Sequence, residues 1–134
     1  MIIFWGAVLG FISVAFGAFA EHGLRETVSP EHFRFLMTAV RYNQIHAVAA
    51  IAIGIGLICS VRLSNSSFVK LSGGLLIIGA SIFSFSIYLS VMFNLPNLVN
   101  FTPIGGITIM SGWGLLAIAA LKIRQVANET NQKI

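Results

Sequence analysis

Six polar or ionisable side chains lie where the apolar stretch at residues 2–20 ends and where the one at residues 45–61 begins. They are the side chains best placed to do chemistry: Glu21, His22, Arg41, Tyr42, Gln44 and His46. Tyr42 and His46 are four residues apart, so they lie one turn apart on a helix face. His46 lies about one turn inside an apolar segment, where an ionisable residue is a functional candidate. Together, Glu21, Arg41 and His46 could form a buried ion pair beside a proton-accepting imidazole. Such a group would suit proton-coupled transport or the binding of a polar ligand.

The same three side chains also have a structural interpretation. A carboxylate, a guanidinium and an imidazole at helix ends can satisfy one another and neighbouring carbonyl groups, and so hold helices together. The residue types leave both interpretations open.

Other kinds of chemistry are not expected from this sequence. The three histidines show no metal-ligand spacing among themselves, and Cys59 is the single cysteine, so we expect no metal site. No nucleophile elbow, phosphate-binding glycine loop or paired-carboxylate motif is present. We therefore expect no catalytic residue, no cofactor and no enzymatic activity. Without a basic stripe interleaved with aromatic residues, we expect no nucleic-acid partner either.

The sequence around these side chains is that of a membrane protein. Residues 71–121 contain no Asp, Glu, Lys, Arg or His, and a charge at the centre of a bilayer costs on the order of 3 kcal/mol. Hydrophobic residues make up 57% of the chain and charged residues 9%, against roughly 45–50% and about 25% in soluble domains. We expect an integral protein of the cell membrane, in contact with the lipid bilayer.

Four apolar stretches are long enough to cross the bilayer as helices. A crossing needs about 20 residues, and backbone groups in lipid must be hydrogen-bonded within the segment. The expected fold is all-α, with four transmembrane helices in one bundle that forms a single domain over residues 1–134. The predicted spans are residues 2–20, 45–61, 71–93 and 104–121.

An amphipathic segment at about residues 30–43 precedes the second predicted span. Ser29-Pro30-Glu31 is a helix-start signal. One face carries polar side chains and the opposite face is apolar, which favours a helix in the headgroup region. This helix leads into the second span either through a bend or continuously. It is either a surface connector or a re-entrant lid over a polar site. The polar face consists of Glu31, Arg34, Thr38 and Arg41.

The distribution of Lys and Arg predicts that both termini are cytoplasmic. With four crossings, the termini and the second loop share one membrane side, and the more basic side is favoured as cytoplasmic. That side carries Arg62, Lys70, Lys122, Arg124 and Lys133, and the opposite side carries Arg25, Arg34 and Arg41.

Glycines spaced along the spans predict close helix packing. Small residues let helix backbones approach where lipid gives no hydrophobic drive for association. They indicate a tightly packed bundle and are also suited to self-association, so we expect a homo-oligomer. The glycines predicted at packing faces are Gly6, Gly10, Gly17, Gly54 and Gly112.

Several of these segments resemble a known family. FGAFAEHGL at residues 16–24 and TAVRYNQIHA at residues 38–47 are similar to the two signatures of the domain-of-unknown-function 423 family. FSFSIYL at residues 83–89 and TPIGG at residues 102–106 resemble that family as well, as does the later Gly112-Trp113 pair.

The resemblance runs from the first predicted span to the fourth. It implies a small multi-pass membrane protein and no particular activity. Two positions depart from the family pattern: Ala20-Glu21 stands where Gly-Ala is usual, and Asn43 stands where glutamine is usual. The resemblance therefore favours His22, Arg41, Tyr42 and His46 over Glu21 as functional candidates.

Two functions are compatible with these observations. The first is a non-enzymatic helical bundle that self-associates or supports another membrane protein. The second is a small proton- or ion-coupled transporter or channel that uses the polar cluster where the first two spans meet.

Overall fold

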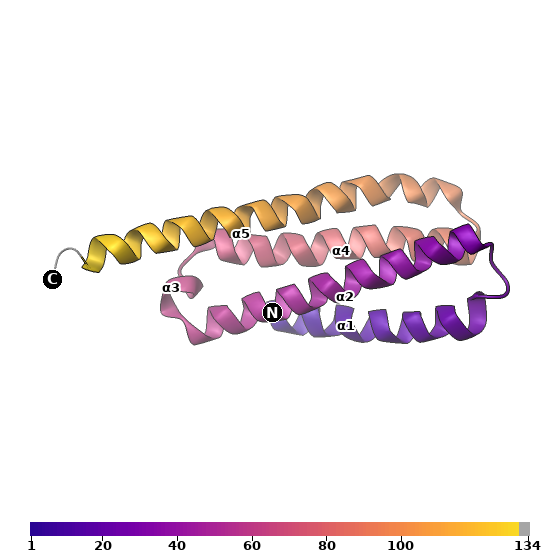
Figure 1. Ribbon diagram of the computed structural model, residues 1–134, viewed down its shortest axis with the longest axis horizontal. Coiled ribbons are helices and arrows are strands. Elements are labelled where there is room, and N and C mark those ends of the chain that lie inside the picture. Colours follow the sequence, from indigo (N-terminus) through magenta and orange to yellow (C-terminus); the bar gives the residue numbers. More distant parts are fainter. Residues whose placement is uncertain (132–134) are drawn as a thin grey trace.

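The computed structural model describes residues 1–131, with side chains up to Val126, and every regular element in this part is helical. Lys133, which contributes to the predicted topology, lies outside the described residues. Four long helices lie along a common direction and alternate in sense (Figure 1). The elements are α1 (Ile2–Phe19), η1 (Ala20–Leu24), α2 (Pro30–Cys59), α3 (Val61–Ser64), α4 (Ser67–Phe93), η2 (Pro96–Phe101) and α5 (Thr102–Asn131).

These helices agree with the predicted spans in number and order. Four segments are long and apolar enough to cross a membrane: α1 with η1, α2, α4, and η2 with α5. The prediction of four long apolar helices packed together is confirmed.

Helix α2 is one continuous helix, which is one of the two alternatives that the sequence left open. The structure shows no separate amphipathic helix before the second span: residues 30–43 are the first half of α2. The Ser29 side chain accepts a hydrogen bond from the backbone N–H of His32 at 3.2 Å, and Pro30 occupies the first turn. No glycine or proline occurs from residue 31 to residue 53, so nothing in the sequence interrupts the helix.

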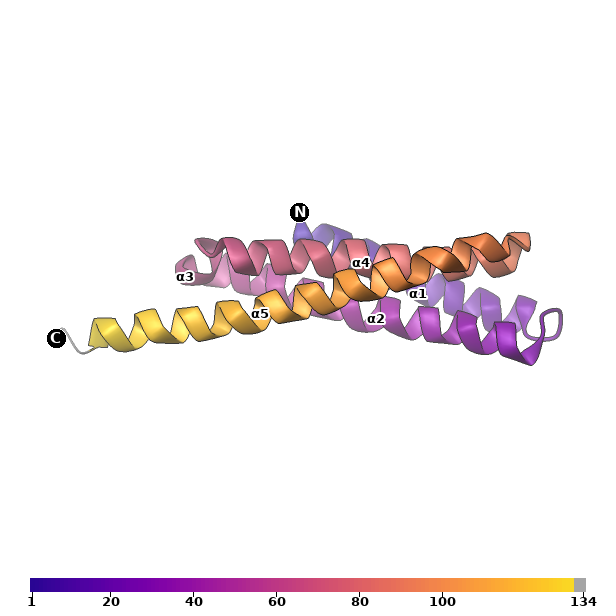
Figure 2. The same cartoon turned by 90° about the horizontal axis from the view of Figure 1, so that it is seen from above.

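The four helices form an open arrangement. Helix α4 packs against both α2 and α5, and α2 packs against α1, so α1 and α5 lie at the two edges (Figures 1 and 2). Helix α1 contacts α4 only lightly. Large apolar side chains consequently remain exposed on every long helix, for example Phe11, Val48, Ile78 and Met110. Such a surface is suited to lipid or to another membrane protein.

The five glycines predicted at packing faces all lie at helix contacts. A Cβ atom on Gly6 would lie 2.9 Å from the Ile51 Cγ1 atom, and one on Gly112 would lie 2.9 Å from the Leu76 Cδ2 atom. These positions let the helix backbones approach closely. Gly6, Gly10 and Gly17 face α2, Gly54 faces α1, and Gly112 faces α4.

Helices α4 and α5 approach each other still more closely where Gly79 and Gly105 meet. These two glycines were not among the five predicted at packing faces. A Cβ atom on Gly105 would lie 2.5 Å from the Phe83 backbone nitrogen and 2.9 Å from the Gly79 carbonyl oxygen. On the neighbouring Gly106, an added Cβ atom would meet no atom within 4 Å. The contact therefore requires glycine at residue 105 and leaves residue 106 free.

Candidate functional site

The contacts between α1 and α2 show beside which part of the apolar run of α1 each α2 residue lies. Gly17 of α1 faces Val40, and Gly10 faces Ala47. Residues 40–47 therefore lie beside the middle and second half of the apolar run of α1. His46 was predicted about one turn inside a span. The structure places it near the middle of the helices instead, because α2 begins at Pro30.

His46 is buried, with 5% of its surface exposed, and both of its ring nitrogens have partners. Its Nδ1 atom lies 2.5 Å from the Tyr42 carbonyl oxygen, and the Trp113 Nε1–H group donates to its Nε2 atom at 3.3 Å. An indole N–H can only donate, and a backbone carbonyl can only accept. This pattern fits the tautomer that carries its proton on Nδ1 and accepts at Nε2. The hydrogen bond between Trp113 and His46 also joins α5 to α2.

A second polar group lies on the same face of α2, towards α4. Asn43 is fully buried and Tyr88 is 2% exposed. The Tyr88 hydroxyl lies beside the side chains of Asn43 and Ser84, and the Phe16 ring stacks on the Tyr88 ring with centroids 3.8 Å apart. Neither the Asn43 amide nor the Tyr88 hydroxyl makes a hydrogen bond of good geometry.

The Ser84 hydroxyl, in contrast, donates to the Ala39 carbonyl oxygen at 2.9 Å and so joins α4 to α2. We call Asn43, His46, Ser84, Tyr88 and Trp113 the midplane polar cluster, after the position of His46 near the middle of α2. It holds three long helices together and has unused hydrogen-bonding capacity at Asn43 and Tyr88.

The polar cluster predicted where the first two spans meet does not assemble. Glu21 forms its ion pair with Arg25, one turn later, and Arg41 is exposed. The expected buried pair of Glu21 with Arg41 is therefore wrong. The physical reason is that Arg25, one helical turn from Glu21, pairs with it, while the Arg41 side chain is exposed.

The remaining predicted residues divide between the interior and the surface. His22 is exposed in η1, and Gln44 is exposed on α2. Tyr42 is 40% exposed and stacks on Phe83, with ring centroids 4.4 Å apart. Of the six predicted residues, only His46 belongs to the midplane polar cluster, with Tyr42 contributing its carbonyl oxygen.

The element η1 is a π-helical turn that contains Glu21 and His22. Such turns are rare and are frequent at functional sites. Glu21 and His22 are held here at one end of the helices, away from His46, so η1 does not contribute to the midplane polar cluster.

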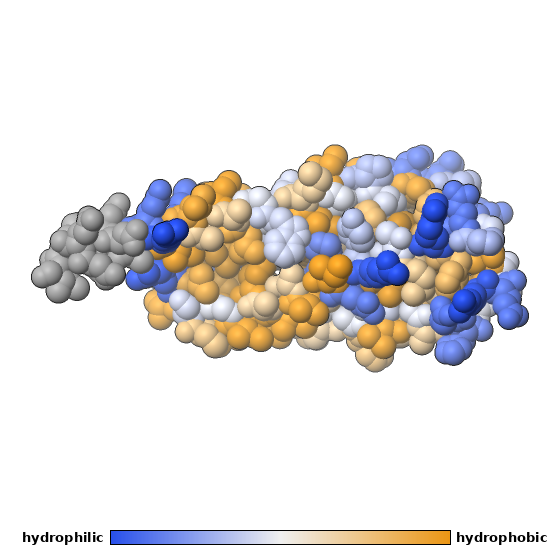
Figure 3. All heavy atoms as spheres, in the orientation of Figure 1, coloured by the Kyte–Doolittle hydropathy of each residue, from blue (hydrophilic) through white to orange (hydrophobic). Residues whose placement is uncertain are grey.

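Polar side chains also occur on the outward side of α2. Arg41 and Gln44 are exposed, and they lie between the contacts of Val40 with Gly17 and of Ala47 with Gly10. They are therefore at the depth of the apolar run of α1. Figure 3 shows hydrophilic surface at the end where α2 begins and also further in, towards the middle of this face.

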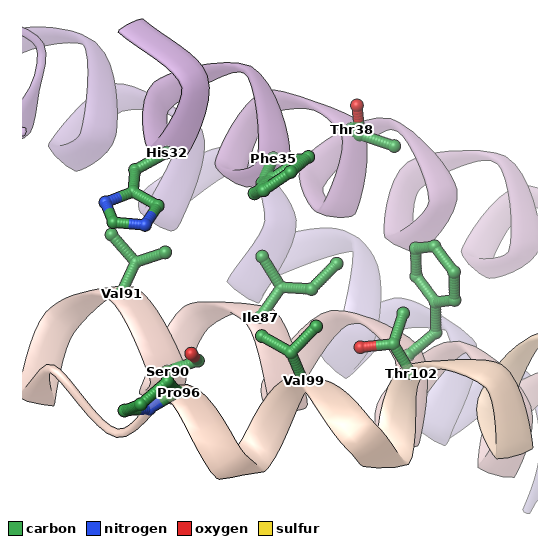
Figure 4. A pocket seen from close by; sticks show the side chains of 10 residues that line it. His32, Phe35, Thr38, Ile87, Ser90, Val91, Pro96, Val99 and Thr102 are labelled. Carbon is green, nitrogen blue, oxygen red and sulfur yellow. The ribbon is translucent and has the colours of Figure 1, made fainter. Parts of the chain in front are cut away.

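A cavity of about 290 Å³ lies between the first half of α2 and the end of α4, and η2 and the start of α5 close its other side. Figure 4 shows His32 and Phe35 reaching from α2 towards Val91 and Ile87 of α4. Val99 and Thr102 complete the opposite wall. This cavity and the midplane polar cluster are the two candidate functional sites.

Four members of the midplane polar cluster were missed by the sequence analysis: Asn43, Ser84, Tyr88 and Trp113. Asn43 shares a helix face with His46 because the two are three residues apart, and Ser84 and Tyr88 share one because they are four apart. These spacings are the sequence signal that indicates Asn43, Ser84 and Tyr88. Trp113 had no such signal, because its partner His46 lies 67 residues away in the chain.

Within residues 1–126, no three His, Cys, Asp or Glu side chains lie close enough together to hold a metal ion.

Comparison with known proteins places the chain in a family. The family described as "Protein of unknown function (DUF423)" matches residues 16–106. The chain belongs to this family. The matched range extends from the end of α1 to the start of α5, and it includes both signature segments on which the resemblance was based.

Curated members of the corresponding UPF0382 group are similar over nearly their whole length. The inner membrane protein YgdD of Escherichia coli is 30% identical over 125 residues, which cover 93% of this chain and 92% of YgdD. A membrane protein of Staphylococcus haemolyticus is 33% identical over 122 residues, covering 91% of this chain and 96% of that protein. No solved structure matches the chain. This protein is thus a multi-pass membrane protein of the UPF0382 family.

Proposed function

We propose that this protein is a non-enzymatic membrane protein that self-associates through the outward side of α2. We call Arg41, Gln44, Val48 and Ala52, which are all exposed, the α2 outer face. The observation that carries the proposal is Gln44, a carboxamide that faces outward at the depth of the apolar run of α1.

Lipid offers Gln44 no hydrogen-bond partner, and none of the side chains described in this chain supplies one. Arg41, one turn nearer the membrane surface, can extend its long side chain towards the headgroups. The shorter Gln44 side chain lies deeper and cannot. Buried carboxamides in membranes find their partners across helix interfaces.

A second copy supplies a suitable partner by symmetry. A carboxamide has both donors and an acceptor, so two Gln44 side chains can pair across a twofold axis. An Arg41 guanidinium can also donate to the Gln44 oxygen of the other copy, in a reciprocal arrangement. Val48 and Ala52 continue this face with apolar atoms, and Ala52 lets the two helices approach.

Replacement of Gln44 tests the proposal. We expect Gln44→Leu to weaken dimerisation in liposomes about tenfold, through the loss of two interhelical hydrogen bonds of about 0.7 kcal/mol each. Fluorescence energy transfer between labelled copies measures the dimer fraction. Gln125→Leu, at an exposed position of α5, is the matched control and should leave dimerisation unchanged. A wild-type protein that stays monomeric at high protein-to-lipid ratios would rule out the proposal.

Proton- or ion-coupled transport is the second candidate, and the burial of His46 near the middle of the helices favours it. The Trp113 N–H group occupies the Nε2 atom of His46, so proton uptake there requires the two side chains to separate. Proton flux into liposomes that is lost in His46→Ala, with the fold intact, would support transport. Equal flux in protein-free liposomes would exclude it.

We also propose that both termini face the cytoplasm, as the Lys and Arg distribution predicts. In a Cys59→Ser background, Asn97→Cys should react with a membrane-impermeant maleimide on intact spheroplasts, and Asn65→Cys should not. Labelling of Asn65→Cys and not of Asn97→Cys would show that both termini face away from the cytoplasm.

A further inference from the structure

The cavity beside α2 is elongated along the helices. On α4 its wall extends from Phe83 to Val91, which is about 12 Å at 1.5 Å per residue. His32 and Val91 lie at the end where α2 begins and α4 finishes, and Phe83 lies deeper, where it stacks on Tyr42. The long direction of the cavity is therefore close to that of a lipid chain in the surrounding bilayer.

The polarity of the cavity changes along this direction. At the deep end, the Thr102 hydroxyl is hydrogen-bonded to Ser86 at 2.8 Å, and Thr38 donates to the Arg34 carbonyl oxygen at 2.9 Å. At the shallow end, Ser90 is only 7% exposed, yet its hydroxyl makes no hydrogen bond within the described structure. The His32 ring at the same end is exposed, and it too is without a hydrogen bond or ion pair within the described structure. Unused polar groups are thus confined to the shallow end.

We propose that this cavity binds one acyl chain of a membrane phospholipid, with the ester oxygens at Ser90 and His32. The Ser90 hydroxyl and a ring N–H of His32 can donate to ester carbonyl oxygens, while Phe35, Ile87 and Val99 surround the methylene groups. None of the described residues that line the cavity is Lys or Arg, so an ester fits better than a free carboxylate. The volume, near the lower limit of about 300 Å³ for ligand sites, suits part of one chain.

Photolabelling in nanodiscs tests this assignment. The probe is a phosphatidylcholine with a diazirine near the middle of one acyl chain, mixed into the disc lipid at low mole fraction. Mass spectrometry should find labelling at Phe35, Ile87 or Val99 at least tenfold above that at the lipid-facing Ile78. Equal labelling at these positions would show ordinary lipid contact and overturn the proposal.

Two variants separate binding from folding. Val99→Trp should fill the cavity and lower the labelling of Ile87 at least tenfold, whereas Ile107→Trp, at an exposed position of α5, should not. Ser90→Ala removes a hydroxyl that makes no internal hydrogen bond, so the fold should persist while labelling falls about fivefold. Unchanged labelling in both Val99→Trp and Ser90→Ala would contradict the proposal.

If a diazirine-labelled fatty acid enters the cavity and the phospholipid does not, the ligand assignment is wrong. The test does not depend on self-association.

Discussion

His46 and Trp113 form the contact that best explains how a histidine is accommodated in the apolar part of this protein. Both imidazole nitrogens are occupied, one by a backbone carbonyl and one by an indole N–H group. A polar group that is buried without a partner destabilises a fold, and a satisfied one adds about 1 kcal/mol. The arrangement gives both ring nitrogens of His46 a partner and couples α2 to α5.

Removal of the indole donor should therefore destabilise the protein. We expect Trp113→Phe to lower the free energy of unfolding by about 1 kcal/mol, because it leaves His46 Nε2 without a partner while keeping an aromatic ring. Titration with a denaturing detergent, followed by circular dichroism, measures this change. Trp5→Phe, at a tryptophan of similar exposure whose indole N–H group makes no hydrogen bond within the described structure, is the control and should have a smaller effect. Equal stability of the two variants would mean that the hydrogen bond contributes nothing.

At this scale the sequence predicted individual residues better than their partners. His46 was recognised because ionisable residues are rare in apolar segments. Its partner Trp113, and the proximity of Tyr88 to Asn43, depend on how α2, α4 and α5 pack, which no local spacing reveals. The predicted pairing of Glu21 with Arg41 is wrong because Arg25, one helical turn from Glu21, pairs with that carboxylate instead.

At the scale of the elements, the continuity of α2 sets how far His32, Asn43 and His46 lie from the start of that helix. The hydropathy pattern divided it into an amphipathic segment and a span because the charged residues end at Arg41. Backbone hydrogen bonding does not follow that division, because no helix breaker occurs there. The helices themselves were predictable from their length and apolar composition, and the continuity of α2 was left open.

The contact of α4 with α5 gives a prediction that belongs to this scale. Gly105→Ala should lower the free energy of unfolding by about 2 kcal/mol, because the added Cβ would lie 2.5 Å from the Phe83 nitrogen. Gly106→Ala should leave stability unchanged or raise it by up to about 1 kcal/mol, through its higher helix propensity. The same detergent titration compares the two variants. Similar effects at both positions would contradict the proposed close packing.

The whole molecule is an open set of helices rather than a closed bundle, and this property links the fold to the proposed function. Because α1 and α5 lie at opposite edges, α2 keeps an outward side along its length. Lipid can cover its apolar residues, whereas Gln44 needs a polar partner. The number of spans was predictable from composition. The open arrangement was not, because it depends on which faces of the helices contact one another.

Cysteine cross-linking in liposomes tests the central claim, self-association through the α2 outer face, most directly. In a Cys59→Ser background, Val48→Cys places a thiol on this face, and Ile78→Cys places one on an exposed position of α4. Under mild oxidation, we expect Val48→Cys to give a disulfide-linked dimer, which Gln44→Leu reduces, and Ile78→Cys to remain monomeric. If Val48→Cys cross-links no more than Ile78→Cys does, the α2 outer face does not join two copies.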